Sequence, residues 1–181
     1  MNPQPVRLLV TGNEESGRSV VAFDGDAPGT ILAPGRPVAM TDLWHMSKVP
    51  TDPRADGADP QQRPYTLAPL PEGLVFRVVQ FDPMTDEQRA RFTGREVFGA
   101  MNAADAHVGT SSNPFMHRTM TVDFGIVLEG TMTMLVDDGE VEISAGEILV
   151  QRATNHAWEN RSGKRAVVAF ILVDARESGG K

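Results

Sequence analysis

The sequence predicts an all-β protein built as one closed barrel or sandwich of short strands. From residue 116 onward, β-prone runs recur about every eight to twelve residues, a spacing typical of such folds. Turn signals separate them, among them Asp137-Asp138-Gly139 and Ala145-Gly146. An Asp-Gly pair supplies the positive φ values that a tight hairpin needs. The length of 181 residues fits one domain with a substantial core.

The N-terminal part of the chain adds strands and loops to this barrel. Residues 6–10 and 19–23 form two β-prone runs and predict a hairpin, and residues 38–46 predict a further strand. Residues 24–37 are rich in Gly and Pro, and residues 49–64 have the composition of an exposed flexible loop. The predicted organisation is residues 1–65 packing on the barrel, residues 66–174 as the barrel itself, and residues 175–181 as a disordered tail.

A short helical insertion interrupts the β pattern at residues 82–101. Thr85 and Gln88 are spaced as a capping box, which predicts a helix that continues to Phe92 and ends at Gly94. A second helical turn is expected over residues 96–101. The apolar side chains of this insertion allow two placements, as a wall or lid over the barrel mouth or as a helix packed on the outside.

One stretch of the barrel carries a row of polar side chains. His117, Thr119, Thr121 and Asp123 follow one another at every second position. Side chains on a strand alternate faces with this period, so one strand would present all four on a single face. Buried polar groups cost about 1–3 kcal/mol each when unsatisfied, so an enclosed row of this kind indicates a functional site.

The row and a later segment resemble the two motifs of the cupin superfamily, a family of jelly-roll β-barrels. His117, Thr119, Asp123 and Gly130 fall on the frame of the first motif, with Thr in place of a second His and Asp in place of Glu. His156 and Asn160 match the end of the second motif, in which Gln151 and Ala153 replace the usual Pro and Gly. The resemblance covers residues 66–174 and implies a cupin jelly-roll with extra N-terminal strands and the helical insertion.

The resemblance also implies a candidate site. His117, His156 and Asp123 stand at metal-ligand positions and would hold Fe(II), Zn(II), Ni(II) or Mn(II) as a divalent cofactor. Asp123 is shorter than the usual Glu, so it could instead orient His117 through a hydrogen bond. The Thr119 hydroxyl would bind a substrate oxygen or a water. His107 is a further imidazole that could lie at the barrel mouth.

Three function classes follow from these residues. The leading prediction is a metal-dependent cupin enzyme, of dioxygenase, decarboxylase or isomerase type, acting on a small oxygenated or carbonyl-containing organic molecule. The first alternative is a metal-free isomerase, dehydratase or cyclase that uses His and Asp in acid–base chemistry. The second alternative is a non-catalytic cupin that binds a small ligand.

Charge and composition exclude several other classes. The net charge of −7 argues against binding to nucleic acid or to an anionic membrane surface, both of which need basic patches. No apolar run approaches the ~20 residues of a membrane span, and the N-terminus has no pattern of a secretory signal. The absence of cysteine excludes disulfides and thiolate sites. We therefore expect a cytoplasmic protein, and the resemblance implies a homodimer that pairs through the N-terminal strands.

Overall fold

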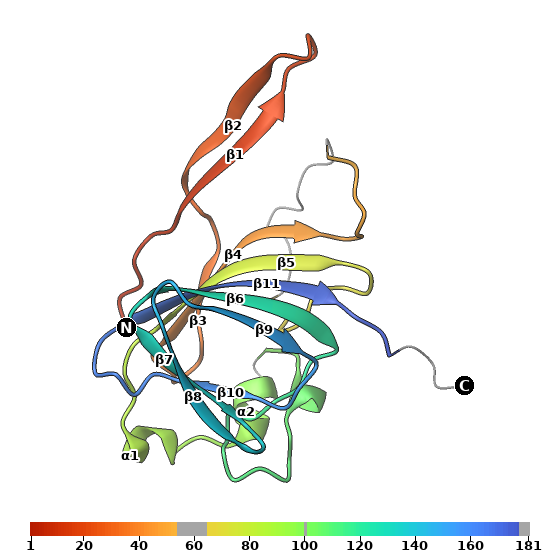
Figure 1. Ribbon diagram of the computed structural model, residues 1–181. Coiled ribbons are helices and arrows are strands. Elements are labelled where there is room, and N and C mark those ends of the chain that lie inside the picture. The colour runs from red at the N-terminus through yellow and green to blue at the C-terminus, as the bar shows by residue number, and fades with distance from the viewer. Residues whose placement is uncertain (54–64, 100, 178–181) are drawn as a thin grey trace.

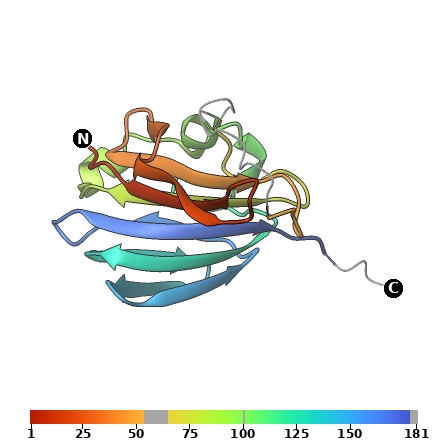
Figure 2. The ribbon, with the colours of Figure 1, turned by 90° about the horizontal axis from the view of Figure 1, so that it is seen from above.

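The computed structural model describes residues 1–53, 65–99 and 101–177, and it confirms the all-β prediction. Two antiparallel sheets form the barrel (Figure 1). The larger sheet has the strand order β3-β4-β5-β11-β6-β9, and its neighbouring strands can be followed by colour in Figure 2. These strands are β3 (Thr30–Leu32), β4 (Val38–Met46), β5 (Leu74–Phe81), β11 (Ala166–Asp174), β6 (Thr121–Glu129) and β9 (Ile148–Arg152).

The smaller sheet covers one face of the larger sheet. Its order is β10-β7-β8, with β7 (Thr131–Val136), β8 (Gly139–Ser144) and β10 (Ala157–Glu159). Val136 pairs with Gly139, so Asp137 and Asp138 form the predicted tight turn. The core lies between the two sheets, and it joins side chains of the large sheet to those of the small one, including Val79, Val127, Val168, Met132, Met134 and Trp158.

The N-terminal hairpin is confirmed and forms a separate two-stranded sheet, of which Leu8 packs on Leu43, Val78 and Ala169 of the large sheet. β1 (Arg7–Asn13) and β2 (Ser19–Asp26) pair only with each other and project from the barrel (Figure 1). The predicted boundary at residue 65 does not separate two layers, because β4 pairs along its length with β5 and lies inside the large sheet. Residues 54–64 of the predicted flexible loop and residues 178–181 of the predicted tail lie outside the described residues.

The helical insertion differs in detail from the prediction. Thr85 and Gln88 form the predicted capping box of α1 (Asp86–Arg89), but this helix ends at Ala90. Gly94 begins the next helix, α2 (Gly94–Gly99), instead of ending the first one. A short 3₁₀ turn, η2 (Ala104–Ala106), follows. None of the helices in the described ranges is long and apolar enough to cross a membrane.

The polar row begins before its strand does. β6 starts at Thr121, so the prediction that His117 and Thr119 belong to this strand is wrong. His117 instead makes isolated bridges to His107 and His156. Its backbone N–H donates to the carbonyl of His156, and the N–H of His156 donates to the carbonyl of His117, both at 2.9 Å. This pairing fixes the two histidines beside each other at the end of the small sheet.

Candidate functional site

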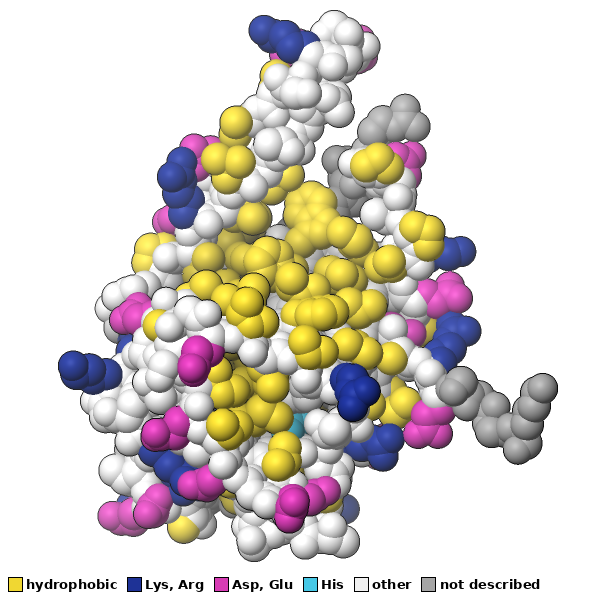
Figure 3. All heavy atoms as spheres, in the orientation of Figure 1, with side chains coloured by type: hydrophobic (Ala, Val, Ile, Leu, Met, Phe, Trp, Pro, Cys, Tyr) yellow, Lys and Arg dark blue, Asp and Glu magenta, His cyan; other side chains and the backbone are white. Residues whose placement is uncertain are grey.

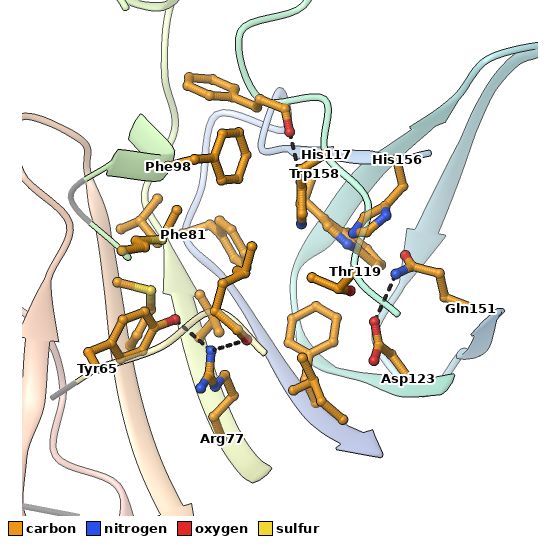
Figure 4. Close-up of a pocket in the computed structure, with 18 of the residues that line it drawn as sticks. Tyr65, Arg77, Phe81, Phe98, His117, Thr119, Asp123, Gln151, His156 and Trp158 are labelled. Atoms are coloured by element: carbon orange, nitrogen blue, oxygen red, sulfur yellow. Dashed lines mark hydrogen bonds between the residues drawn. The ribbon is translucent and has the colours of Figure 1, made fainter. Parts of the chain in front are cut away.

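A cavity of about 110 Å³ lies between the two sheets and is lined by the four residues predicted to be catalytic or metal-binding (Figure 4). His117, Thr119, Asp123 and His156 line one side of it. Tyr65 and Arg77 line the opposite side in Figure 4. The rest of the lining is mainly apolar and includes five aromatic residues, Phe81, Phe98, Phe115, Trp158 and Phe170.

The helical insertion supplies part of this lining and is therefore a wall of the cavity. Phe98 of α2 is buried, and its ring centroid lies 4.8 Å from that of His117. Met101, just after α2, is also buried and lines the cavity. Of the two placements allowed by the sequence, the structure shows the one beside the candidate site.

His117 and His156 form a close pair with a fixed tautomer. Their ring centroids are 4.0 Å apart. The Nδ1 of His117 lies 2.9 Å from the carbonyl oxygen of Phe115, and the Nδ1 of His156 lies 2.9 Å from that of Thr154. A carbonyl oxygen only accepts, so each Nδ1 carries the proton and each Nε2 keeps a free lone pair.

Both imidazoles are neutral at physiological pH. Burial, the nearby His156 and other positive groups hold the pKa of His117 well below its usual value, against a hydrogen bond to Phe115 that raises it. Burial also lowers the pKa of His156 to about 4. Two adjacent positive charges in a dry cavity would be costly, so the pair offers hydrogen-bond acceptors, not cations.

Asp123 lies in β6 directly opposite Gln151 of β9. The Gln151 side chain donates to Asp123 Oδ2 at 2.8 Å (Figure 4). Asp123 Oδ1 is buried and has no hydrogen-bond partner. Burial raises the pKa of Asp123 to about 6, against the lowering effects of Thr121, Arg77 and Gln151. The carboxyl group therefore titrates close to neutral pH and keeps one oxygen free.

Thr119 is buried beside Asp123, and its hydroxyl is engaged. Thr119 Oγ1 lies 2.8 Å from Thr121 Oγ1, and either oxygen can donate. A hydroxyl can donate one hydrogen bond and accept two, and this pair uses one of those positions, so the Thr119 hydroxyl can still bond to a molecule in the cavity. Its predicted contact with a substrate oxygen stays a prediction.

The opposite side of the cavity holds a satisfied ion pair that the sequence reasoning missed. Arg77 Nε lies 2.9 Å from Asp42 Oδ1, and His45 Nε2 lies 3.1 Å from Asp42 Oδ2. Arg77 also donates to the Tyr65 hydroxyl at 2.6 Å. The available signal was a lone Arg inside the apolar strand Leu74–Phe81. Arg77 therefore fixes Tyr65 at the cavity edge.

Three buried side-chain atoms in the described ranges have neither a hydrogen bond nor an ion pair. They are Arg36 Nε, His107 Nε2 and Asp123 Oδ1. Two of these residues, Arg36 and Asp123, line the cavity. Unsatisfied buried polar atoms are rare in native proteins and call for an explanation, which a bound ligand would supply.

His107 does not serve as a third imidazole of the cavity. Its backbone bridges to His117, and its ring stacks on Phe98 with centroids 5.8 Å apart. Its Nε2 faces the backbone of Gly94, where an added Cβ would collide with it. The ring is therefore used in packing against α2, which requires Gly at position 94.

The predicted metal ligands fit an ion only in part. The free Nε2 lone pairs of His117 and His156 are suited to a divalent metal, since ligating imidazoles usually donate their other N–H to a carbonyl or carboxylate. However, no three His, Asp or Glu side chains in the described ranges are grouped so that they could hold an ion together. Asp123 is bonded to Gln151, and two protein ligands are fewer than the three usual in catalytic zinc and Fe(II) sites. The residues present do not form the predicted three-ligand set.

Comparison with known proteins gives matches to a cupin family model and to fungal proteins. Residues 104–173 match the family model described as "Cupin domain". The chain is 43% identical over 74 residues to oryzines biosynthesis cluster protein J of Aspergillus oryzae, which is 40% of this chain and 40% of that protein. It is 41% identical over 66 residues to the cupin-domain-containing oxidoreductase srdD of Neurospora crassa, 34% of each protein.

A further relative matches along almost the whole chain. The chain is 27% identical over 178 residues to phomopsin biosynthesis cluster protein C' of Diaporthe leptostromiformis, which is 93% of this chain and 78% of that protein. The matches to the Aspergillus and Neurospora proteins span less than half of their lengths.

Proposed function

We propose that this protein, whose residues 104–173 match the family model of the cupin domain, is an enzyme of small-molecule biosynthesis that moves protons on a carbonyl-containing organic substrate. The reaction class is isomerisation, dehydration or cyclisation, performed by acid–base chemistry. The observation that carries this proposal is Asp123, a buried carboxyl group with a pKa of about 6 and one unpartnered oxygen. The names of the relatives, which refer to biosynthesis clusters and to oxidoreductases, support an enzyme that acts on small molecules.

Asp123 is the proton-transfer group in this proposal. A catalytic acid or base works best when its pKa lies near the working pH, and burial provides that condition here. The free Oδ1 would take a proton from a carbon next to the substrate carbonyl, and the same carboxyl would return it at another atom. Gln151 holds Oδ2, so that Oδ1 is the oxygen that meets the substrate.

The two histidines and Tyr65 would orient the substrate between them. The neutral Nε2 atoms of His117 and His156 accept hydrogen bonds from substrate O–H groups. The Tyr65 hydroxyl, held by Arg77 and with its pKa raised by burial, donates to a substrate oxygen on the other side. The aromatic lining between these groups suits a flat, unsaturated molecule.

The metal-dependent alternative needs a third ligand. The free lone pairs of His117 and His156 favour it, while the bond between Gln151 and Asp123 and the lack of a three-residue group disfavour it. Elemental analysis of protein purified without a histidine tag separates the two proposals. Near-stoichiometric metal that is lost in both His117→Ala and His156→Ala would contradict acid–base catalysis without metal.

The direct test is exchange of carbon-bound hydrogen with D₂O, followed by NMR. Panels of β-diketones, β-keto acids and hydroxylated aryl ketones serve as substrates, in the presence of a chelator. The wild type is expected to accelerate exchange at the carbon next to the carbonyl. Asp123→Asn should reduce the rate about 10²- to 10⁴-fold, the usual contribution of a general acid or base.

Glu142→Gln is the matched control, because it removes one carboxylate from an exposed position of β8. Its exchange rate should equal that of the wild type. Unchanged exchange in Asp123→Asn, or exchange that the chelator abolishes in the wild type, would overturn the proposal.

We further propose that the partner of this chain is a second copy of itself. The outer face of the large sheet is apolar across neighbouring strands: Phe76, Ile171, Phe124 and Val150 lie in register from β5 to β9. Figure 3 shows hydrophobic side chains gathered over this face at the base of the hairpin. An antiparallel sheet usually presents polar side chains to water on its outer face.

The projecting hairpin supplies a matching surface. Its side chains Leu9, Val21 and Phe23 are 51%, 58% and 41% exposed. A two-stranded hairpin is marginally stable alone in water, so this one gains from packing on another surface. Two such surfaces on one chain permit a two-fold dimer in which each hairpin packs on the sheet of its partner.

A further inference from the structure

Arg36 is a charged residue of the cavity for which the proposed chemistry gives no role. It follows β3 and lines the cavity of the candidate site together with His117 and Tyr65. It also lines a smaller adjoining cavity, where Glu159 is found. The side chain is thus directed into the barrel from the rim, on a different segment from every other polar residue of the site.

Arg36 has no polar partner in the described part of the chain. Its Nε is buried without a hydrogen bond. Among the residues that the structure describes, no carboxylate lies within ion-pair distance of its guanidinium. The guanidinium lies over the Phe115 ring, whose centroid is 4.0 Å from Arg36 Cζ. A cation over an aromatic face gains about 0.5–2 kcal/mol but leaves the N–H donors unused.

Glu159, the carboxylate whose charge acts on Arg36, already has other partners. Glu159 Oε1 accepts from Asn113 at 2.7 Å and lies 3.1 Å from Arg89 Nε. Glu159 Oε2 accepts from Arg161 at 2.7 Å. With both oxygens in use, Glu159 acts on Arg36 only through space, as a charge that supports the protonated guanidinium.

Arg77, unlike Arg36, has hydrogen-bond acceptors for its guanidinium donors. Arg77 is buried in the same cavity, but Asp42, Tyr65 and two carbonyl groups satisfy its donors. A guanidinium presents its N–H groups as a planar fork that matches a carboxylate with two parallel hydrogen bonds. Burial lowers the pKa of Arg36 to about 10, which leaves it charged at neutral pH.

We infer that Arg36 binds an acidic group of the ligand, and that the cavity takes a compact unsaturated or aromatic carboxylate. The enclosed volume of about 110 Å³ compares with the apolar cavity of about 150 Å³ that accepts benzene. The apolar part of the site therefore accommodates about one ring. The substrate's carboxylate lies at the rim on Arg36, and its reacting end lies toward Asp123.

This inference rests on the proposed function for the position of the reacting end, and binding alone tests it. The probes are benzoate, 4-hydroxybenzoate and cinnamate, each compared with its own primary amide by titration calorimetry. The wild type should bind at least one carboxylate about ten-fold or more tightly than its amide. Arg36→Met, which keeps the apolar stem on Phe115, should lose that preference by about 10- to 100-fold, the effect of one charge-assisted pair.

Two further variants keep the test falsifiable. Arg91→Met removes a positive charge from an exposed ion pair, that of Arg91 with Glu87. This variant should still prefer the carboxylate to its amide as strongly as the wild type does. Arg36→Lys keeps the charge without the fork and should retain part of the preference if Arg36→Met fails to fold. The inference is overturned if no carboxylate is preferred by the wild type, or if Arg36→Met keeps the preference.

The outcomes also separate this inference from the proposed function. Loss of carboxylate preference in Arg36→Met with intact hydrogen exchange in the uncharged diketones supports Arg36 as the binding residue and leaves Asp123 chemistry in place. Exchange that depends on Asp123 while no carboxylate binds would overturn the inference alone. Carboxylate binding through Arg36 with no exchange on any substrate would support the inference and contradict the proposed chemistry.

Discussion

The two faces of β6 show an inverted pattern of polarity. On the inner face, Thr121 and Asp123 are buried, while on the outer face Phe124 is 39% exposed and Leu128 is 54% exposed. In an ordinary antiparallel sheet the apolar side chains face the core and the polar ones face water. The inversion is what our proposals would require, in which the inner face binds a small molecule and the outer face binds a second copy of the chain.

The buried polar groups in and around the cavity are of two kinds. Arg77 and Asp42 satisfy each other, whereas Asp123 and Arg36 keep atoms without partners. A satisfied pair stabilises one conformation of the protein, and an unsatisfied atom is stabilised only when a ligand arrives. This difference separates structural polar residues from the candidates for function.

The largest expected effect on stability comes from breaking the satisfied pair. Asp42→Asn removes one partner of a buried ion pair and leaves the Arg77 charge uncompensated, which typically costs about 3–5 kcal/mol. Urea unfolding monitored by Trp fluorescence measures this loss. Arg7→Met, which breaks an exposed pair with Asp24 on the hairpin, is the control and should change stability by less than ~1 kcal/mol. Equal losses in the two variants would contradict the distinction between satisfied and exposed pairs.

The next largest expected effect is on the oligomeric state, through substitutions on the outer face of the large sheet. Phe124→Glu and Ile148→Glu place a charge on the apolar face, where Ile148 is 69% exposed. In the proposed dimer these charges would be buried without a partner, so the variants should be monomeric at concentrations where the wild type is dimeric. Sedimentation velocity measures the change. A wild type that is monomeric at all concentrations would contradict this interpretation of the face.

The pH dependence of stability gives a smaller and more specific effect. Burial raises the pKa of Asp123 to about 6, so its protonated form favours the folded state. The contribution of Asp123 to the free energy of unfolding is complete below its unfolded pKa near 4, and it is lost as the pH rises through about 6. The stability of the wild type relative to Asp123→Asn should therefore fall over this window, by at most about 3 kcal/mol.

His156 contributes with the opposite sign in the same range. Its pKa is lowered to about 4, so its contribution is present above the unfolded pKa near 6.5 and is lost as the pH falls through about 4. The two effects partly cancel in the wild type. The difference between the wild type and Asp123→Asn, measured by urea unfolding at several pH values, isolates the Asp123 contribution. A difference that stays constant or rises from pH 4 to 6 would contradict a raised pKa.

Much of the fold followed from local signals in the sequence. The turn at Asp137-Asp138-Gly139 and the capping box of Thr85 and Gln88 depend on neighbouring residues, and both were predicted correctly. The start of β6 was misplaced because His117 pairs with His156, a contact between segments distant in the chain. The start of α2 at Gly94 was missed although its signal is local, because Thr93 and Glu96 form a second capping box. The His107 ring against Gly94, a tertiary contact, explains only why a glycine stands there.

The site could be predicted only as far as its motif residues. His117, Thr119, Asp123 and His156 do meet in one cavity, as their motif positions predicted. Gln151 was noticed as a departure from the family pattern, but its bond to Asp123 depends on the register of β6 and β9. Arg36 and Arg77 belong to segments far from the motifs, and their different roles depend on which carboxylate each one reaches. Sequence alone does not contain that information.

The central claim is that Asp123 is a carboxyl group poised to transfer protons near neutral pH. Its most direct test is the titration of the Asp123 carboxyl carbon by ¹³C NMR of the chelated protein, together with the pH profile of hydrogen exchange. The account predicts a midpoint of about 6 in both measurements and the loss of both signals in Asp123→Asn. A midpoint near 4, or exchange whose pH profile does not follow this carboxyl group, would contradict it.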